Sequence, residues 1–421
     1  MKDYFDNILE YIQSLTVIDT HEHLPPNDLE MRPDGNILSV YFTAYLYEDL
    51  ISAGLPLEDA RAMLDPRIPL MDNWKRVEPY WQMIRNTGYA REARLTIKLL
   101  YEMDDFHGDT LEELNRRFLE ARRPGIYEEI LHKRCKIETC LLDSDLNADR
   151  RYFRSTVRMD PFIYPRNLDM FHEIERSVGF RISRFDDWLE ACERYFENAI
   201  QIGAVALKSN LAYERGLHYE RSTYSEAERE FKDLLVPLRY PPWDHEYIRT
   251  GKKFQDYMMH YILGLAQRRG FPFQIHTGLQ AGNGNLMRDA DPSLLCNLFL
   301  EYPDVKFGVM HIGYPNYQTL AVQAKCFPNV YIDMSWAHII SPNASIAALN
   351  EYLDAVPVNK IFAFGGDHHH IDAVVGHLHM MQRNLAKAVA GKMQEHSLNL
   401  EEAKFVIKRL LYDNPKQVYQ L

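Results

Sequence analysis

Residues 15–23 read LTVIDTHEH, a short apolar and β-branched run that ends in His21 and His23. This composition favours a β-strand. Side chains at positions i and i+2 of a strand face the same way, so both imidazoles can point to one side while Glu22 points to the other. The two histidines can therefore offer nitrogen ligands to one cation, although an H-x-H pair alone is weak evidence for a metal site.

Seven more short runs of this kind follow along the chain. They are KIETCLLD (136–143), PFIYPRN (161–167), AVALKSN (204–210), PFQIHTG (272–278), VKFGVMHIG (305–313), NVYIDMSW (329–336) and KIFAFGGD (360–367). Segments with helical apolar spacing separate them, such as FQDYMMHYILGLAQRR (254–269), which Gly270 and Pro272 end. Eight strands alternating with helices predict a (β/α)8 barrel. An open doubly wound sheet would need a phosphate-binding glycine fingerprint after an early strand, and the sequence has none.

The predicted strands are unevenly spaced. Residues 26–134, between the first two strands, have helical spacing without strand signals, and we interpret them as a helical insertion in the first βα loop. Residues 211–250 are interpreted as a second insertion, after the fourth strand. No repeat, low-complexity tract or flexible linker marks a second domain, so we expect residues 1–421 to form one domain.

The composition narrows the classes of partner. The 421 residues include 48 Lys and Arg against 60 Asp and Glu, for a formal net charge of −12, and 46% of them are hydrophobic. A globular protein with this charge and no long basic cluster is a poor partner for nucleic acid or an anionic membrane, so a small molecule is favoured. Five cysteines without paired short spacing and a start unlike a secretion signal lead us to expect a cytoplasmic protein. We also expect a homo-oligomer.

Ligand-type residues end three other predicted strands. His276 ends the fifth strand, His311 the sixth and Asp367 the eighth. The C-terminal ends of barrel strands meet at one face, where barrel enzymes have their active sites. Together with His21 and His23, these residues predict a metal site at that face.

The H-x-H pair, Lys208 on strand four, His276, His311 and Asp367, in this order, resemble the ligand set of the amidohydrolase superfamily. Members of that superfamily are metal-dependent (β/α)8 barrels. The resemblance covers all eight predicted strands, and YDNPKQVYQL (412–421) is similar to the closing helix of amidohydrolase-related proteins.

A secondary resemblance is to uronate isomerase, a non-hydrolytic branch of the superfamily. It rests on the long insertion after strand one, on PRN (165–167) and on HTGLQAGNGN (276–285) after strand five. The presence of His311 and Lys208 departs from that branch.

The resemblance implies a divalent metal bound by His21, His23 and Asp367, with His276 as a further ligand or a substrate contact. Nitrogen and oxygen ligands suit zinc, manganese and iron alike, and we expect zinc. Asp367 would also take a proton from the attacking water and pass it to the leaving group. With one ion, His311 would stabilise developing negative charge as a hydrogen-bond donor; with two ions, His276 and His311 would hold the second.

Lys208 has two functional interpretations. In binuclear relatives the corresponding lysine is carbamylated and bridges the metals; otherwise its ammonium could bind a substrate carboxylate. A lysine whose stem merely packs is the third alternative. We favour carboxylate binding, because Arg166 on strand three and Arg215, in AYERGL (212–217), would bring further cations to the mouth.

Other aromatic and histidine residues follow the last two strands. Trp336 and His338 follow strand seven, and we expect both to contact substrate, with packing as the alternative. His368, His369 and His370 are consecutive loop residues that cannot all face one ion, so one at most is expected to contact substrate.

These observations favour a metal-dependent hydrolase acting on a small, carboxylated substrate. The alternative is a uronate isomerase-like enzyme that interconverts aldose and ketose forms of sugar acids. A metal-dependent decarboxylase and a non-catalytic barrel also remain open, although loss of catalysis would usually break the ligand set.

Overall fold

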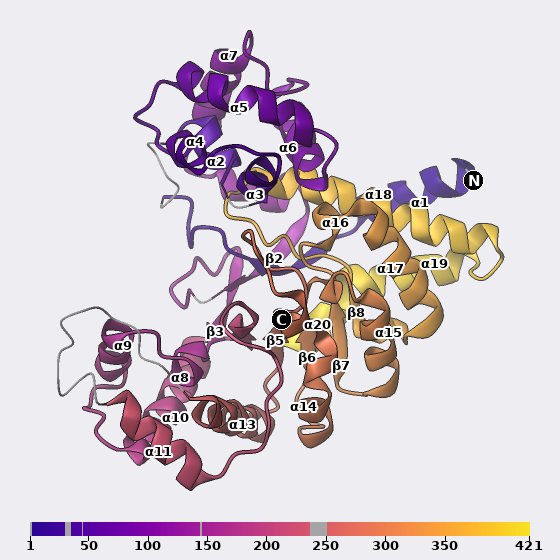
Figure 1. Cartoon of the computed structure of the whole chain (residues 1–421). Coiled ribbons are helices and arrows are strands. Elements are labelled where there is room, and N and C mark those ends of the chain that lie inside the picture. The colour runs from indigo at the N-terminus through magenta and orange to yellow at the C-terminus, as the bar shows by residue number, and fades with distance from the viewer. Residues whose placement is uncertain (1, 30–34, 44, 144, 236–250) are drawn as a thin grey trace.

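A computed structural model describes the whole chain except residues 1, 30–34, 44, 144 and 236–250 (Figure 1). Eight parallel strands form one sheet in the order β1 to β8, and each pairs with the next along the chain. They are β1 Val17–Glu22, β2 Ile137–Asp143, β3 Phe153–Arg158, β4 Ala206–Ser209, β5 Phe273–Ile275, β6 Phe307–Val309, β7 Val330–Asp333 and β8 Ile361–Phe362. The Thr20 N–H donates to Phe364 O at 3.1 Å and so joins β1 to the chain leaving β8. The predicted (β/α)8 barrel is confirmed.

The third strand differs from the prediction. It is Phe153–Arg158, whereas 161–167 begins within the short helix α8 (Asp160–Ile163) and continues as loop. Pro161 stands in the first turn of α8, where a helix does not need its missing N–H, and this favours helix over strand. The apolar content of 161–167 was therefore a misleading strand signal.

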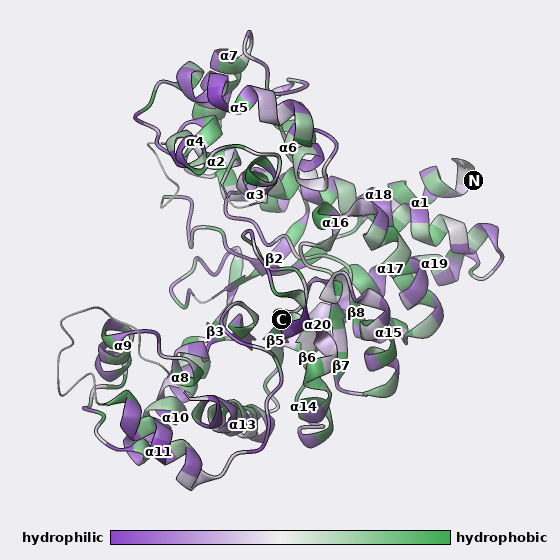
Figure 2. Cartoon of the chain, viewed as in Figure 1, coloured by the Kyte–Doolittle hydropathy of each residue, from purple (hydrophilic) through white to green (hydrophobic). Residues whose placement is uncertain are grey.

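Helices surround the sheet, and Figure 2 shows them carrying both hydrophobic and hydrophilic residues along their ribbons. Outside the first insertion they are α1 Lys2–Ser14, α8 Asp160–Ile163, α9 Leu168–Val178, α10 Phe185–Ile202, α11 Tyr224–Leu234, α13 Lys252–Arg269, α14 Cys296–Glu301, α15 Tyr317–Cys326, α16 Ala337–Ile340, α17 Pro342–Ala355, α18 Ala373–Gln394, α19 Leu400–Lys408 and α20 Asn414–Tyr419. As predicted, α13 stops at Gly270, which has the left-handed φ of +60° that glycine adopts without strain. None of the described helices is long and apolar enough to cross a bilayer.

Between β1 and β2 the chain forms a helical lobe (Figure 1, top). Its helices are α2 Ile37–Tyr41, α3 Tyr45–Ser52, α4 Leu57–Met63, α5 Leu70–Ile84, α6 Gly88–Tyr101 and α7 Leu111–Ala121. The lobe has a hydrophobic core separate from that of the barrel, and this core includes Trp336, Ile339 and Met380 from the barrel side. Apolar burial therefore anchors the lobe to the segments that follow β7 and β8.

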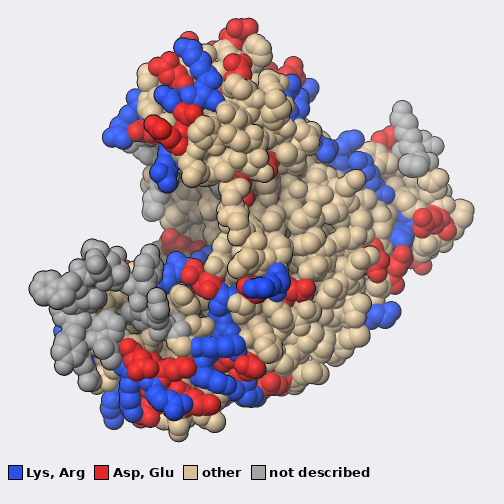
Figure 3. All heavy atoms as spheres, in the orientation of Figure 1, with Lys and Arg blue, Asp and Glu red and all other residues tan. Residues whose placement is uncertain are grey.

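A second lobe contains α8 to α11 and α13, and the surface is hollowed between the two lobes (Figure 3). Part of the second predicted insertion, residues 236–250, lies outside the described residues. The described part starts with the short helix Leu211–Tyr213 directly after β4 and continues through α11. Both lobes thus leave the barrel from loops at the C-terminal ends of strands.

The close packing of α18 on α6 predicts the effect of a mutation. A Cβ added at Gly376 would lie 2.6 Å from Glu92 O and would also clash with Thr96. We expect Gly376→Ala to lower the free energy of unfolding by about 1–3 kcal/mol, because the helices would have to separate. Urea denaturation measures this change.

Gly391→Ala, on the same helix, is the matched control, because no described atom lies within 4 Å of the added Cβ. It should leave stability unchanged or raise it by up to about 1 kcal/mol through helix propensity. Equal destabilisation by both substitutions would contradict the close-packing argument.

Candidate metal centre

The three predicted ligands His21, His23 and Asp367 converge at the C-terminal mouth of the barrel. The Nε2 atoms of His21 and His23 are 3.2 Å apart, and Asp367 Oδ1 lies 3.3 Å from the first and 3.2 Å from the second. Ligands bound tetrahedrally to an ion such as zinc, each about 2.0–2.1 Å from it, stand about 3.3 Å from one another. The donor atoms therefore fit one divalent ion, and they are the one such group of three in the described part of the chain.

The protonation states of these groups suit a cation. Burial and the nearby Lys208 lower the pKa of His21 to about 3, so its imidazole is neutral at pH 7. Burial alone would raise the pKa of Asp367, but its contacts with His21 and His23 hold that pKa well below the ordinary value. Neutral imidazoles beside an ionised carboxylate are the ligand forms that divalent metals bind.

Lys208 lies beneath this triangle, as its place on β4 predicts. Its side chain is buried, with Nζ 3.2 Å from His21 Nε2 and 3.0 Å from the sulfur of Met310. Burial lowers the pKa of Lys208 to about 8, although Asp143 and Asp367 oppose the shift. A minority of the amines is therefore neutral near pH 7, so both functional interpretations of Lys208 stay open.

His311 and His276 also line the site region, but their hydrogen bonds limit their roles. His311 Nδ1 lies 3.0 Å from Ser335 O, to which it donates, so Nε2 carries the lone pair. Burial lowers the pKa of His311 to about 4, which keeps the ring neutral. The donor role expected for His311 requires a proton on Nε2, and the bond to Ser335 instead makes Nε2 an acceptor.

His276 is outside the three-ligand group. Its Nε2 lies 2.9 Å from Leu279 O and donates to it, which leaves Nδ1 as the acceptor. The ring centroid is 4.3 Å from that of His311, so the two histidines form one wall of the site. The structure thus does not place His276 with the predicted ligands His21, His23 and Asp367.

His21, His23, Asp367, Lys208 and His276 line a pocket of about 330 Å³, whereas His311 is fully buried and is not among its lining residues. Its base includes His21, His23, Lys208 and Asp367, and Arg158 from the end of β3 lies beside them. Such a volume suits a small organic molecule.

Aromatic rings form the walls of this pocket. Tyr45 from α3 stacks on Trp336 with ring centroids 4.7 Å apart, and Tyr213 and His369 contribute further surface. The Tyr45 hydroxyl donates to Asp367 O at 2.5 Å. The first insertion therefore contributes a side chain that touches both the pocket and the candidate metal centre.

The loop after β5 covers the same pocket and links the two lobes. Ala281 lines the pocket, and its N–H donates to the Tyr213 hydroxyl at 2.9 Å. The next N–H, that of Gly282, donates to the carboxylate of Glu48 on α3. The stretch HTGLQAGNGN (276–285) is thus part of the wall of the site.

Three residues that were predicted to contact substrate, Arg166, Arg215 and His338, lie outside the pocket. Arg166 lies in the loop after α8 and not on a strand, so its side chain is exposed. It pairs there with Glu214. Arg215 pairs with the buried Asp256 at 2.8 Å and holds the second lobe together. None of the three predicted residues is among the described residues that line the pocket.

His338 is the third of these residues. It is fully buried, and its Nε2 donates to Ala363 O at 2.9 Å. Packing, the alternative interpretation, describes its position, whereas Trp336 does line the pocket.

Sequence reasoning missed Asp143, Arg158 and Tyr45. Arg158 Nε lies 3.0 and 3.1 Å from the two carboxylate oxygens of Asp143, and Asp143 Oδ2 is 3.8 Å from His23 Nε2. Asp143 is the last residue of a correctly predicted strand, so the strand-end rule that selected His276 would have found it. Arg158 was missed because the third strand was predicted at the wrong residues. Tyr45 lies on a helix, where no strand-end pattern marks a residue as part of the site.

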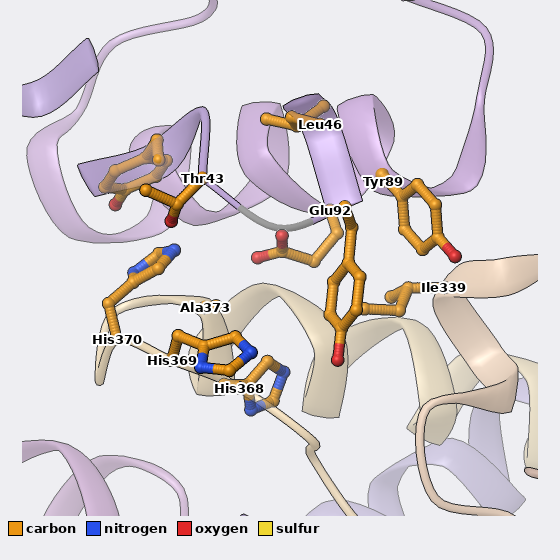
Figure 4. Close-up of a pocket in the computed structure, with 11 residues that line it drawn as sticks. Thr43, Leu46, Tyr89, Glu92, Ile339, His368, His369, His370 and Ala373 are labelled. Atoms are coloured by element: carbon orange, nitrogen blue, oxygen red, sulfur yellow. The ribbon is translucent and has the colours of Figure 1, made fainter. Parts of the chain in front are cut away.

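A second, smaller chamber of about 30 Å³ is lined by Tyr45 and His369, which also line the larger pocket. Figure 4 shows Glu92 and Thr43 from the helical lobe facing His370 and His369 of the β8 loop. This volume holds about two water molecules. Burial of Glu92 raises the pKa of its carboxyl to about 7.

The chain is similar to known proteins over part or nearly all of its length. Residues 218–421 match the sequence model of the amidohydrolase family. Protein fluG of Emericella nidulans is 25% identical over 52% of this chain, and the match spans only 26% of the fungal protein.

Two further relatives cover nearly the whole chain. A uronate isomerase of Thermotoga neapolitana is 21% identical over 97% of this chain and 95% of its own length. The crystal structure of a uronate isomerase from Thermotoga maritima superposes with a TM-score of 0.77 at 16% identity, covering 99% of this chain and 97% of that one. The likeness to the solved structure shows the fold: the protein is a (β/α)8 barrel, and its C-terminal half, residues 218–421, is similar to the amidohydrolase family.

Proposed function

We propose that the protein is a metal-dependent hydrolase that acts at an ester, lactone or amide carbonyl of a small, carboxylated substrate. The observation that carries the proposal is the convergence of His21, His23 and Asp367 on one point at the base of a 330 Å³ pocket. A divalent ion held there supplies Lewis acidity, which makes water a nucleophile near neutral pH and polarises a carbonyl.

Asp367 is the proton carrier in this proposal. Its Oδ1 faces the two histidines, while Oδ2 lies 3.7 Å from His311 Nδ1, so its two oxygens face different partners. An ionised carboxylate in this position can accept a proton from the attacking water and return it to the leaving group.

Lys208 would orient the substrate. The ammonium of Lys208 would bind the substrate carboxylate, a charge-assisted contact that gains strength in a buried site. The aromatic walls, Tyr45 and Trp336, would exclude water from the reacting carbonyl.

A uronate isomerase-like activity is the second candidate, and the curated uronate isomerase that aligns over almost the whole chain favours it. Isomerisation moves a proton between adjacent carbons of an open-chain sugar acid. Incubation of the zinc-loaded protein with a uronate in D2O separates the candidates: deuterium at carbon 2 supports isomerisation and counts against the hydrolase.

The metal site predicts a stoichiometry. Protein purified with zinc should hold about one ion per chain, since one group of three ligands is assembled, and His21→Ala should reduce this to nearly none. Elemental analysis measures both values. His107→Ala removes an exposed histidine and should retain the ion; equal zinc in His21→Ala and the wild type would contradict the site.

Turnover of ester, lactone and amide libraries tests the hydrolase. Asp367→Asn cannot accept the proton and should lower kcat by about 10²–10⁴-fold on any substrate found. The exposed Asp354 supplies the control, because Asp354→Asn should leave kcat unchanged. If none of these compounds is turned over in a reaction that requires Asp367, the proposed hydrolysis is refuted.

Lys208→Met tests how the lysine acts. If the ammonium binds a carboxylate, KM for the carboxylated substrate should rise roughly tenfold or more, with zinc content unchanged. A loss of bound metal with little change in KM would instead indicate the carbamylated bridge.

A further inference from the structure

The backbone of the candidate ligand Asp367 is held in an unusual conformation. Its φ is +60°, in the left-handed region that residues with a Cβ rarely adopt. Asp367 follows Gly366, and a Cβ at that glycine would clash with Glu22 and His368, so the segment is packed tightly against β1. Such a conformation persists only where its surroundings hold it.

Three consecutive N–H groups of this segment donate to β1. Gly366 N–H donates to Asp19 Oδ1 at 3.0 Å, Asp367 N–H to His21 O at 2.8 Å, and His368 N–H to Glu22 Oε2 at 2.7 Å. Two of the three acceptors are carboxyl oxygens of side chains, and both side chains are fully buried. The strand that supplies His21, and that His23 follows directly, therefore fixes the peptides on both sides of Asp367.

The Glu22 carboxylate is itself held in place. Its second oxygen, Oε1, accepts from His368 Nδ1 at 2.8 Å, and His368 Nε2 accepts from His377 Nδ1 at 2.9 Å. His377 lies on α18, so the chain of contacts runs from β1 through the β8 loop to a barrel helix. Figure 4 shows His368 on the loop below the helical lobe, beside His369.

We propose that Glu22, together with Asp19, is a positioning residue that holds Asp367 in its left-handed conformation and aims its carboxylate at the two histidines. Glu22 alternates with His21 and His23 along β1, so it faces away from the pocket and touches no substrate. Its effect on the centre passes through the backbone of Asp367. Groups that orient metal ligands in this way typically change metal affinity by 10–100-fold.

This inference rests on the metal binding in the proposed function. Its test is the zinc dissociation constant, measured by chelator competition for the wild type, Glu22→Gln and Glu22→Ala. Gln keeps one oxygen for His368 N–H but cannot accept from Nδ1–H, so affinity should fall about tenfold; Ala removes both acceptors, so affinity should fall about 100-fold.

Asp256→Asn is the matched control. Asp256 is an equally buried carboxylate, but it pairs with Arg215 and Lys252 in the second lobe. This variant should lower the melting temperature of the metal-free protein without changing the zinc dissociation constant. The melting temperature of each metal-free variant thus separates a loss of fold from a loss of ligand positioning.

The possible results separate the proposed function from the positioning role of Glu22. Wild-type protein that binds no zinc overturns the proposed function and this inference with it. Glu22 variants that bind zinc within twofold of the wild type, or an Asp256→Asn variant that loses as much affinity, overturn this inference alone. If Glu22→Ala does not fold, Glu22→Gln decides by the same criterion.

Discussion

The register of β1 against the chain that leaves β8 is the constraint on which the centre depends. Thr20 N–H pairs with Phe364 O and Asp367 N–H with His21 O, so the first and last strands close the barrel at the point where the ligands lie. Side chains alternate along a strand, and a slip of one residue would turn both histidines outward and Glu22 inward. The same bonds that close the sheet therefore create the donor triangle.

Closure also determines the electrostatics of the site. Buried groups without water lose the solvation of their charged forms, and this keeps the imidazoles of His21 and His311 neutral. Carboxylates remain ionised only where cations or hydrogen-bond donors face them, as Arg158 faces Asp143. In such a low-dielectric pocket, the charges that remain act more strongly on a bound molecule than they would in water.

Much of this could be predicted from the sequence, because alternation and strand ends leave a local pattern. Seven of eight strands were predicted close to their positions, and His21, His23 and Asp367 were recognised as strand-end residues. Two arginines were misjudged. Arg166 was assigned to a strand, but Pro161 lies in the first turn of a short helix there and Arg166 lies in the loop that follows, while the partner of Arg215 lies 41 residues away in sequence. Long-range pairing of this kind leaves no local signal.

Hydrogen-bond partners were also beyond prediction. The acceptor state of His311 Nε2 depends on Ser335 O, and the position of His276 Nε2 depends on Leu279 O, both of which are backbone groups brought close by loops. The sequence identifies a histidine, but the fold decides which of its nitrogens carries the proton.

The contact of Tyr45 with Asp367 has a consequence for how such a barrel can diversify. A helical lobe inserted in a loop looks like a module that could be exchanged between relatives, yet this one supplies a hydroxyl to the backbone of a ligand and a ring stacked on Trp336. An exchanged lobe would have to restore both contacts at once. New substrate preferences are therefore more accessible through single substitutions within the lobe than through its wholesale replacement.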